Sequence, residues 1–225
     1  MTLLELKPIT PALIPAAVSL DCQCLGGLWN EAGYQRELES PNSDLLGLLA
    51  KPIANPALST APNGTAIPET PQAPQPSQTS YQASRTVSLI GIGCLWAILT
   101  EAHITLLAIH PNYRQQGLGK LMLCSLLQAA RQRGLEWATL EVRASNQTAI
   151  RLYQQFGFQE AGRRRRYYQD TGEDGLILWR SQLQAPAFAA SLQNWQQQAC
   201  DRIAEHGWQL DRSSTWNRSL RLPTA

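Results

Sequence analysis

The chain has 225 residues, of which 44% are hydrophobic and 16% are charged, and its formal net charge at pH 7 is +2. This length is enough to bury the core of one domain, and so small a charge excludes a protein that binds nucleic acid over its whole surface. The longest apolar run, VSLIGIGCLWAIL, is too short to span a bilayer, and the N-terminal MTLLELKPITPALIP lacks the unbroken apolar stretch of a signal peptide. We therefore expect a cytoplasmic protein.

The cysteines favour reduced thiols over a disulfide framework, because their number is odd and four of the five lie in apolar or helix-like segments. Cys22 and Cys24 form a C-x-C pair, but no second pair of Cys or His follows at the spacing of a zinc finger. We expect no metal site and a reducing compartment.

The first fifty residues contain four expected elements. Residues 3–9 read as a strand, 11–25 and 30–38 as helices, and 43–50 as a second strand.

Residues 51–86 differ in composition from the rest of the chain, since they hold half of the prolines and one acidic residue. Such a segment lacks the periodic apolar residues that offset ordering entropy, which predicts a disordered insertion. Because 43–50 and 87–100 both read as strands, the insertion is expected to join two neighbouring strands of one sheet. A linker between two separate domains is the alternative.

Strands and helices then alternate, which predicts an α/β protein with helices packed on a mixed sheet. The expected strands are 104–109, 138–143, 158–168 and 175–183, and the expected helices are 118–133 and 147–156. Residues 184–225 add an amphipathic helix and a polar tail.

The segment RQQGLGK, residues 114–120, joins an expected strand to an expected helix. Backbone N–H groups and the helix dipole bind anions at such a junction, and glycine lets a ligand approach them. A Walker loop would need glycine at position 114, which is Arg114, and a dinucleotide fingerprint would need a third glycine at position 122, which is Met122. The remaining pattern is R/Q-x-x-G-x-G, although a tight turn with close helix packing would also explain the glycines.

The pattern resembles the pyrophosphate loop of the GNAT acetyltransferases, and LEVRASNQTAIRLYQQFGF (140–158) resembles the second half of their acetyl-CoA site. Within this superfamily, E-V-R-x-S-N, Trp29-Asn30-Glu31 and RYYQDTGEDGLIL (166–178) resemble the RimI group. The resemblance implies the GNAT fold, a mixed central β-sheet flanked by α-helices, over residues 1–183. Residues 51–86 would be the insertion and 184–225 a C-terminal helical extension.

The same resemblance implies an acetyl-CoA-dependent N-α-acetyltransferase, whose acceptor is the N-terminal alanine of a small-subunit ribosomal protein. It implies no metal, no membrane partner and no specific nucleic acid. A GNAT enzyme for another amine, such as a lysine side chain, a polyamine or a small metabolite, is an alternative. A second alternative is a non-catalytic module that binds RNA or protein.

The resemblance also assigns the cofactor site. The backbone of the loop would hold the pyrophosphate, the edge of the preceding strand would pair with the pantetheine arm, and Asn146 would contact the pantetheine while also capping a helix. The cofactor-binding residues expected are Leu107, Ala108, Ile109, Gln115, Gln116, Gly117, Leu118, Gly119, Lys120 and Asn146.

Glu141 is the expected general base, because it places a carboxylate in the middle of a strand, on the face shared with Thr139 and Arg143. A solvated strand face or an ion pair with Arg143 is the alternative. Tyr153 is the expected general acid, with a purely structural tyrosine as its alternative.

Four consecutive arginines, 163–166, precede Tyr167 and Tyr168. Basic and aromatic residues together occur in RNA-binding surfaces, but a strand alternates its faces, so about two of the four arginines share a side. A solvated strand is favoured, with the two tyrosines lining the acceptor cleft.

Overall fold

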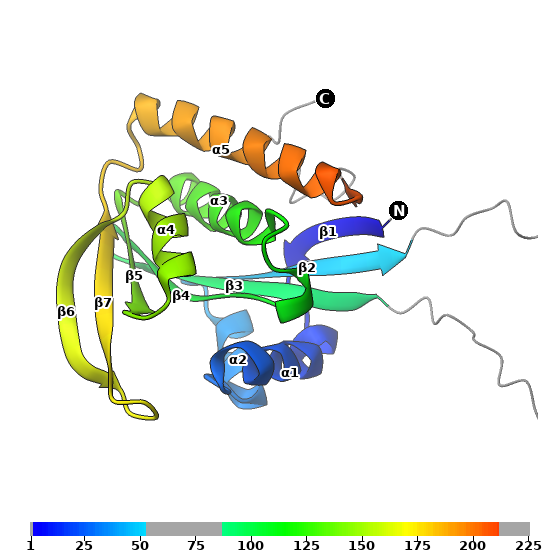
Figure 1. Cartoon of the computed structure of the whole chain (residues 1–225), viewed down its shortest axis with the longest axis horizontal. Helices are drawn as coiled ribbons and strands as arrows, with labels where there is room; N and C mark the ends of the chain where they lie inside the picture. The colour runs from blue at the N-terminus through cyan, green and yellow to red at the C-terminus, as the bar shows by residue number, and fades with distance from the viewer. Residues whose placement is uncertain (1, 53–86, 212–225) are drawn as a thin grey trace, which may run out of the picture.

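A computed structural model describes residues 2–52 and 87–211, and these form one eight-stranded sheet with helices on both faces (Figure 1). The strand order is β6-β7-β5-β4-β3-β2-β1-β8. The strands are β1 (Thr2–Pro8), β2 (Ser43–Pro52), β3 (Ser88–Ile98), β4 (Glu101–Ile109), β5 (Trp137–Arg143), β6 (Gln159–Tyr168), β7 (Glu173–Arg180) and β8 (Trp208–Leu210). The helices are α1 (Ile14–Leu25), α2 (Glu31–Glu39), α3 (Leu118–Gln132), α4 (Gln147–Gln155) and α5 (Pro186–Glu205), with 3-10 turns at Pro11–Leu13 and Pro111–Tyr113.

The helices form layers on either side of the sheet (Figure 1). Helices α1 and α2 cover one face and enclose a smaller hydrophobic cluster, while α3 and α4 cover the other face and α5 lies outside α3. The sheet is mixed, because β4 pairs with β5 in parallel and β5 pairs with β7 antiparallel. The predicted α/β class with a mixed sheet is confirmed.

The two strands that flank the predicted insertion are antiparallel neighbours, β2 and β3, as the sequence indicated. Disorder was predicted for residues 51–86; residues 51–52 instead end β2, and 53–86 lie outside the described residues. Several boundaries differ from the prediction, and the strand expected at 175–183 runs over Glu173–Arg180. The strand expected to reach Thr100 ends at Ile98 in a turn where Leu99 has φ of 56°, and β4 begins at Glu101 rather than Ile104.

Strand β4 carries a β-bulge at Thr105, since Cys94 pairs with Leu106 while the next residue of β3, Leu95, pairs with Ile104. One extra residue turns every following side chain to the other face of the sheet. Ile104 therefore packs in the cluster under α3, whereas Leu106 packs in the cluster under α1. The bulge lies where β4 reaches the candidate site.

Helix α5 is part of the main hydrophobic core. Its buried apolar side chains belong to the same cluster as those of α3, and they are Phe188, Leu192, Ala199 and Ile203. After α5 the chain adds β8, a short strand not predicted from the sequence, which pairs in parallel with β1. The predicted polar tail from residue 212 onward lies outside the described residues.

Within residues 2–52 and 87–211, no helix combines the length and the apolar character needed to cross a membrane. The same residues contain no group of three or more His, Cys, Asp or Glu side chains arranged to hold a metal ion. Cys22, Cys24, Cys94 and Cys124 are free thiols; Cys94 and Cys124 are buried, whereas Cys22 is exposed.

Candidate active site

Strands β4 and β5 pair over only part of their length and then separate. The parallel ladder joins Glu101–Ile104 to Trp137–Leu140, although β4 continues to Ile109 and β5 to Arg143. A cavity of about 890 Å³ lies at this separation, lined by residues 104–107 of β4 and 140–143 of β5. Because the two strands do not pair with each other beyond this point, their facing backbone groups are available to an extended ligand.

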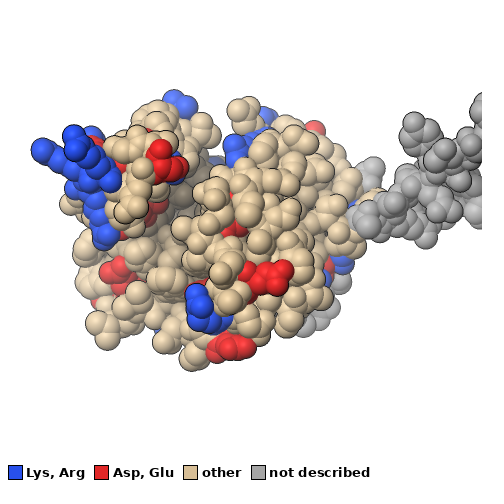
Figure 2. Space-filling model, turned by 90° about the horizontal axis from the view of Figure 1, so that it is seen from below, with Lys and Arg blue, Asp and Glu red and all other residues tan. Residues whose placement is uncertain are grey.

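The cavity continues between two structural units beyond the sheet. The end of α1 and the turn after it line one side through residues 24–26 and 28–29, and the β6–β7 hairpin supplies Arg164, Tyr167 and Tyr168 on the other. Figure 2 shows basic side chains gathered at the end of the molecule where β6 runs, and a hollow between that end and the part covered by α1 and α2.

Glu141 lies on β5 and lines the cavity, with 17% of its side chain exposed. Its Oε1 forms an ion pair with Arg164 Nη2 at 2.9 Å. The ion pair with Arg143 considered from the sequence is absent from the described contacts, because Arg143 pairs instead with Asp170 at 2.8 Å. The carboxylate is thus held from the β6 side and faces the space between the separating strands.

Tyr167 also reaches Glu141, because the β6–β7 hairpin is irregular at this point. The register shifts between Arg164 and Tyr168, and Arg166 has φ of 50°. The Tyr167 ring lies over Gly175, where a Cβ atom would be 3.0 Å from the ring. The Tyr167 hydroxyl donates a hydrogen bond to the Glu141 carboxylate, which raises the pKa of Tyr167. A bulge and a glycine therefore place a second residue of the hairpin on Glu141.

Tyr153 and Asn146 come from α4 and the turn before it. The Asn146 side chain accepts a hydrogen bond from Ala149 N at 3.2 Å, which confirms the predicted helix cap. Tyr153 is 7% exposed, packs edge-on against Phe158 and lines the same cavity. Burial raises the pKa of Tyr153, and Tyr168 adds to the shift, so the hydroxyl keeps its proton.

The aromatic residues of the opposite wall are positioned by a buried carboxylate. Asp21 Oδ2 accepts hydrogen bonds from Trp29 N at 2.8 Å and from the Tyr34 hydroxyl at 3.2 Å. The Trp29 ring then stacks on Trp96 at 6.2 Å between centroids, with the planes 10° apart. The sequence singled out Trp29 but not Trp96 or His103, which also lines the cavity. Trp96 lies in β3 and His103 in β4, and no local sequence pattern in either strand indicates a cavity at these residues.

The loop at 114–120 lies beyond the end of β4, at the start of α3. Gln115 and Gly117 have φ of 63° and 88°, and Gly117 is the N-cap residue. Leu121 N donates to Gly117 O at 3.0 Å, so the preceding amides of the first turn, those of Leu118, Gly119 and Lys120, lack a partner within the helix. This is the arrangement expected of an anion-binding helix start.

The predicted site residues are thus brought together only in part. Leu107, Glu141, Asn146 and Tyr153 line one cavity, whereas Ala108 and Ile109 continue β4 beyond it and are buried. The residues from Gln115 to Lys120 follow at the end of that strand and do not line the cavity. An extended cofactor with an anionic end fits this layout, since an open strand edge leads from the carboxylate and the tyrosine toward unpaired helix amides.

Comparison with known proteins agrees with this architecture. The Acetyltransferase (GNAT) family model matches residues 54–158. The chain is 42% identical over 91 residues to a putative [ribosomal protein bS18]-alanine N-acetyltransferase of Bacillus subtilis, which is 40% of this chain and 60% of that protein. It is 38% identical over 101 residues to the [ribosomal protein bS18]-alanine N-acetyltransferase of Escherichia coli K12, 44% of this chain and 68% of that protein.

A solved structure shares the fold. The crystal structure of the ribosomal-protein-S18-alanine N-acetyltransferase from Escherichia coli superposes with a TM-score of 0.57 at 24% identity, covering 79% of this chain and 93% of that one. The chain spans about 60% of the Bacillus relative and slightly over two thirds of the E. coli relative in sequence. The chain therefore belongs to the GNAT family of acetyltransferases and, within it, resembles the RimI group.

Proposed function

We propose that this protein is an acetyl-CoA-dependent N-α-acetyltransferase that modifies the N-terminal alanine of a small-subunit ribosomal protein. The observation that carries the proposal is the single cavity where β4 and β5 separate, onto which both Glu141 and Tyr153 face. The names of the two relatives support the alanine acceptor.

The residues of the chain divide the chemistry between them. When bound, acetyl-CoA supplies the acetyl group as a thioester. Glu141 takes a proton from the α-ammonium of the acceptor, and the neutral nitrogen attacks the acetyl carbon. A C–N bond forms as the C–S bond breaks, the Tyr153 hydroxyl gives its proton to the departing sulfur, and the second proton of the attacking nitrogen returns to Tyr153. Arg164 and Tyr167 hold the Glu141 carboxylate in place during this exchange.

The outer end of the cavity suits a peptide better than a polyamine. Exposed apolar side chains lie at its rim, Leu25 at 40%, Leu28 at 54% and Tyr167 at 40% exposure. Trp29 and Trp96 form an aromatic wall beside them. A polyamine would be better served by unpaired acids, whereas Asp170 and Glu173 in this cavity are paired with Arg143. Apolar and aromatic side chains can contact the short side chains of a peptide N-terminus.

Replacement of Tyr153 by Phe removes the proposed proton donor and keeps the buried ring. We expect kcat to fall by about tenfold to a hundredfold, because the thiolate must then leave without its acid. The Tm should stay near that of the wild type, since the ring contact with Phe158 is retained. Steady-state kinetics with thermal denaturation would check both values, and an unchanged kcat would leave Tyr153 a structural residue.

The pH dependence of turnover should reflect the acceptor α-amine at acidic to neutral pH and Tyr153 at alkaline pH. An α-amine has a pKa of about 7.7 to 8.0, so kcat/KM for a peptide should rise as pH increases toward about 8. Burial raises the pKa of Tyr153 above its ordinary value, so the hydroxyl stays protonated. We therefore expect no decline of kcat between neutral pH and about pH 10. An alkaline decline centred near pH 9 that is lost in Tyr153→Phe would contradict the raised pKa of Tyr153, and one that persists in Tyr153→Phe would come from another group.

The acceptor can be tested directly by measuring CoA release from acetyl-CoA with a short peptide that copies the N-terminus of the ribosomal protein. The matched control is the same peptide with its α-amine blocked and an internal lysine free. We expect turnover only with the free α-amine. Turnover on the blocked peptide would replace this proposal with lysine acetylation.

A further inference from the structure

The C-terminal segment contacts the loop that precedes α3. Trp208 Nε1, in β8, donates a hydrogen bond to Gln116 Oε1 at 2.7 Å. Lys120 Nζ, in the first turn of α3, donates to Gln198 Oε1 of α5 at 2.7 Å. Two residues of the proposed phosphate loop are therefore bonded to residues of the C-terminal segment.

Gly117, between these two points, lies directly against α5. A Cβ atom at Gly117 would be 3.1 Å from the Cβ and Cγ atoms of Arg202 and 3.3 Å from Ala199 O. The stem of Arg202 thus touches the residue that begins α3. The start of α3 is where the cofactor pyrophosphate would meet the positive end of the helix dipole.

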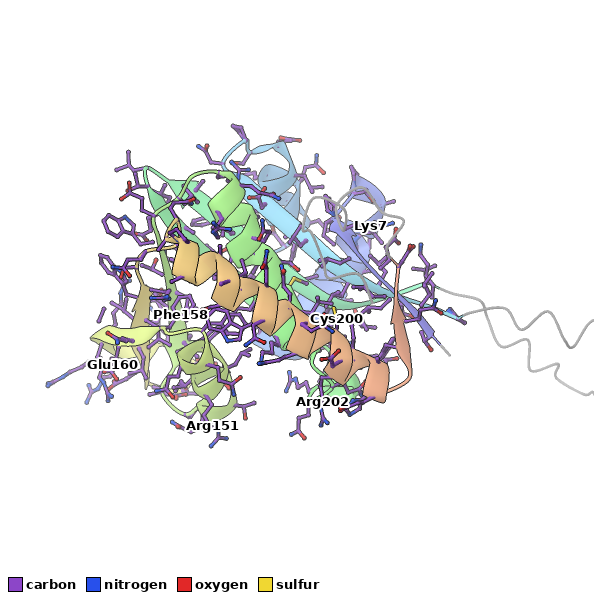
Figure 3. The ribbon with its side chains drawn as sticks, turned by 90° about the horizontal axis from the view of Figure 1, so that it is seen from above. Lys7, Arg151, Phe158, Glu160, Cys200 and Arg202 are labelled. Carbon is purple, nitrogen blue, oxygen red and sulfur yellow. The ribbon has the colours of Figure 1, made fainter. Side chains whose placement is uncertain are left out.

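The guanidinium of Arg202 could leave its surface ion pair to bind a ligand. Its side chain is 54% exposed, and its only described ion pair is with Glu205 at 2.9 Å, an exposed contact three residues along the same helix. Such surface pairs contribute little and exchange readily with water. Figure 3 shows Arg202 near the end of α5, at the same edge of the molecule as Arg151 of α4.

We propose that α5 completes the phosphate site of the cofactor, with Arg202 as an added ligand of the CoA pyrophosphate. The diphosphate would then meet three positive groups from two distant parts of the chain: the α3 amides, Lys120 and Arg202. The inference rests on the proposed use of acetyl-CoA, and it assigns a binding role to the C-terminal helix.

Calorimetric titration of CoA into the full chain tests this without an acceptor or turnover. Arg202→Gln should weaken CoA binding about threefold to tenfold and reduce its dependence on salt, because one charge-assisted contact is lost. The same loss is expected with dephospho-CoA, since the pyrophosphate is retained. Arg36→Gln, the same change in the last turn of α2, is the matched control and should bind CoA like the wild type.

Glu205→Gln separates the charge of Arg202 from its ion pair. Removing the acid should leave CoA affinity equal or slightly higher; a loss as large as that of Arg202→Gln would show that the helix end, not the cation, matters. Wild-type affinity in Arg202→Gln, or a loss seen with CoA and not with dephospho-CoA, would overturn the pyrophosphate assignment. Failure of the wild-type protein to bind CoA would instead contradict the proposed function itself.

Discussion

Glu141→Gln is expected to lower kcat by about a hundredfold to a thousandfold while leaving CoA affinity unchanged. The substituted amide is nearly the same size as the carboxylate but cannot accept the proton of the α-ammonium. Its position should be retained, because Tyr167 can still donate to the side-chain oxygen and β5 remains paired with β7 through Glu141 and Ile177. Steady-state kinetics and calorimetric binding of CoA would measure the two effects separately.

Two control variants sharpen this result. Glu160→Gln makes the same change on β6, where Glu160 is about half exposed and pairs with Arg163, so its kcat should match the wild type. Arg164→Gln removes the partner of Glu141 and keeps the carboxylate, so its effect should be smaller than that of Glu141→Gln. Near-normal turnover in Glu141→Gln would mean another base, and His103, which lines the same cavity, would be the next residue to test.

Gly117→Val should weaken CoA binding about tenfold or more and lower the Tm. At φ of 88° a branched side chain costs about 1–2 kcal/mol or more, because its Cβ meets the following carbonyl. Its Cβ would also press on Arg202 and on Ala199 O of α5. The loop must then move, which turns the amides of the first turn away from the phosphate position. A Tm lower by roughly 3–8 °C is expected for a chain of this length.

Gly134→Val is the matched control, since Gly134 lies at the other end of α3 with φ of 76° and no atom within 4 Å of its Cβ position. The backbone strain is therefore similar, but the contact with α5 and the proximity to the loop are absent. The Tm should fall in both variants, whereas CoA affinity should fall only in Gly117→Val. Equal CoA affinities in the two variants would remove the loop from the cofactor site.

The unit formed by β5 and α4 could be predicted closely from its sequence. Glu141, Asn146 and Tyr153 are close in the chain, so strand alternation and helix spacing decide where they lie relative to one another. The structure places all three on one cavity. Their chemical roles remain predictions until the variants are measured.

The partners of Glu141 could not be predicted, because they depend on an irregular hairpin. Arg164 and Tyr167 reach the carboxylate through the register shift in β6 and the left-handed backbone of Arg166. Both features are tertiary in origin, and no local pattern in the arginine run indicates them. The bulge at Thr105 escaped prediction for the same reason, since apolar residues continue on both sides of it.

The sequence of α3 indicates that another segment covers its outer face. The run LMLCSLL is apolar around the whole circumference of α3, and residues 121–127 are all buried. A helix that is apolar on every side must be covered on its outer face as well as by the sheet. Which segment covers it could not be deduced, because the contact between α3 and α5 joins regions far apart in the chain.

The pairing of the last described strand with the first has a consequence for the order in which this protein matures. Thr2 pairs with Trp208, so the ladder between β1 and β8 cannot form on a growing chain until residues 208–210 have been translated. Trp208 also donates the hydrogen bond to Gln116, and Arg202 precedes it by less than two turns of helix. On a nascent chain the elements from β1 to β7 are therefore available before β8, and the contacts that β8 makes with β1 and with the loop before α3 come last.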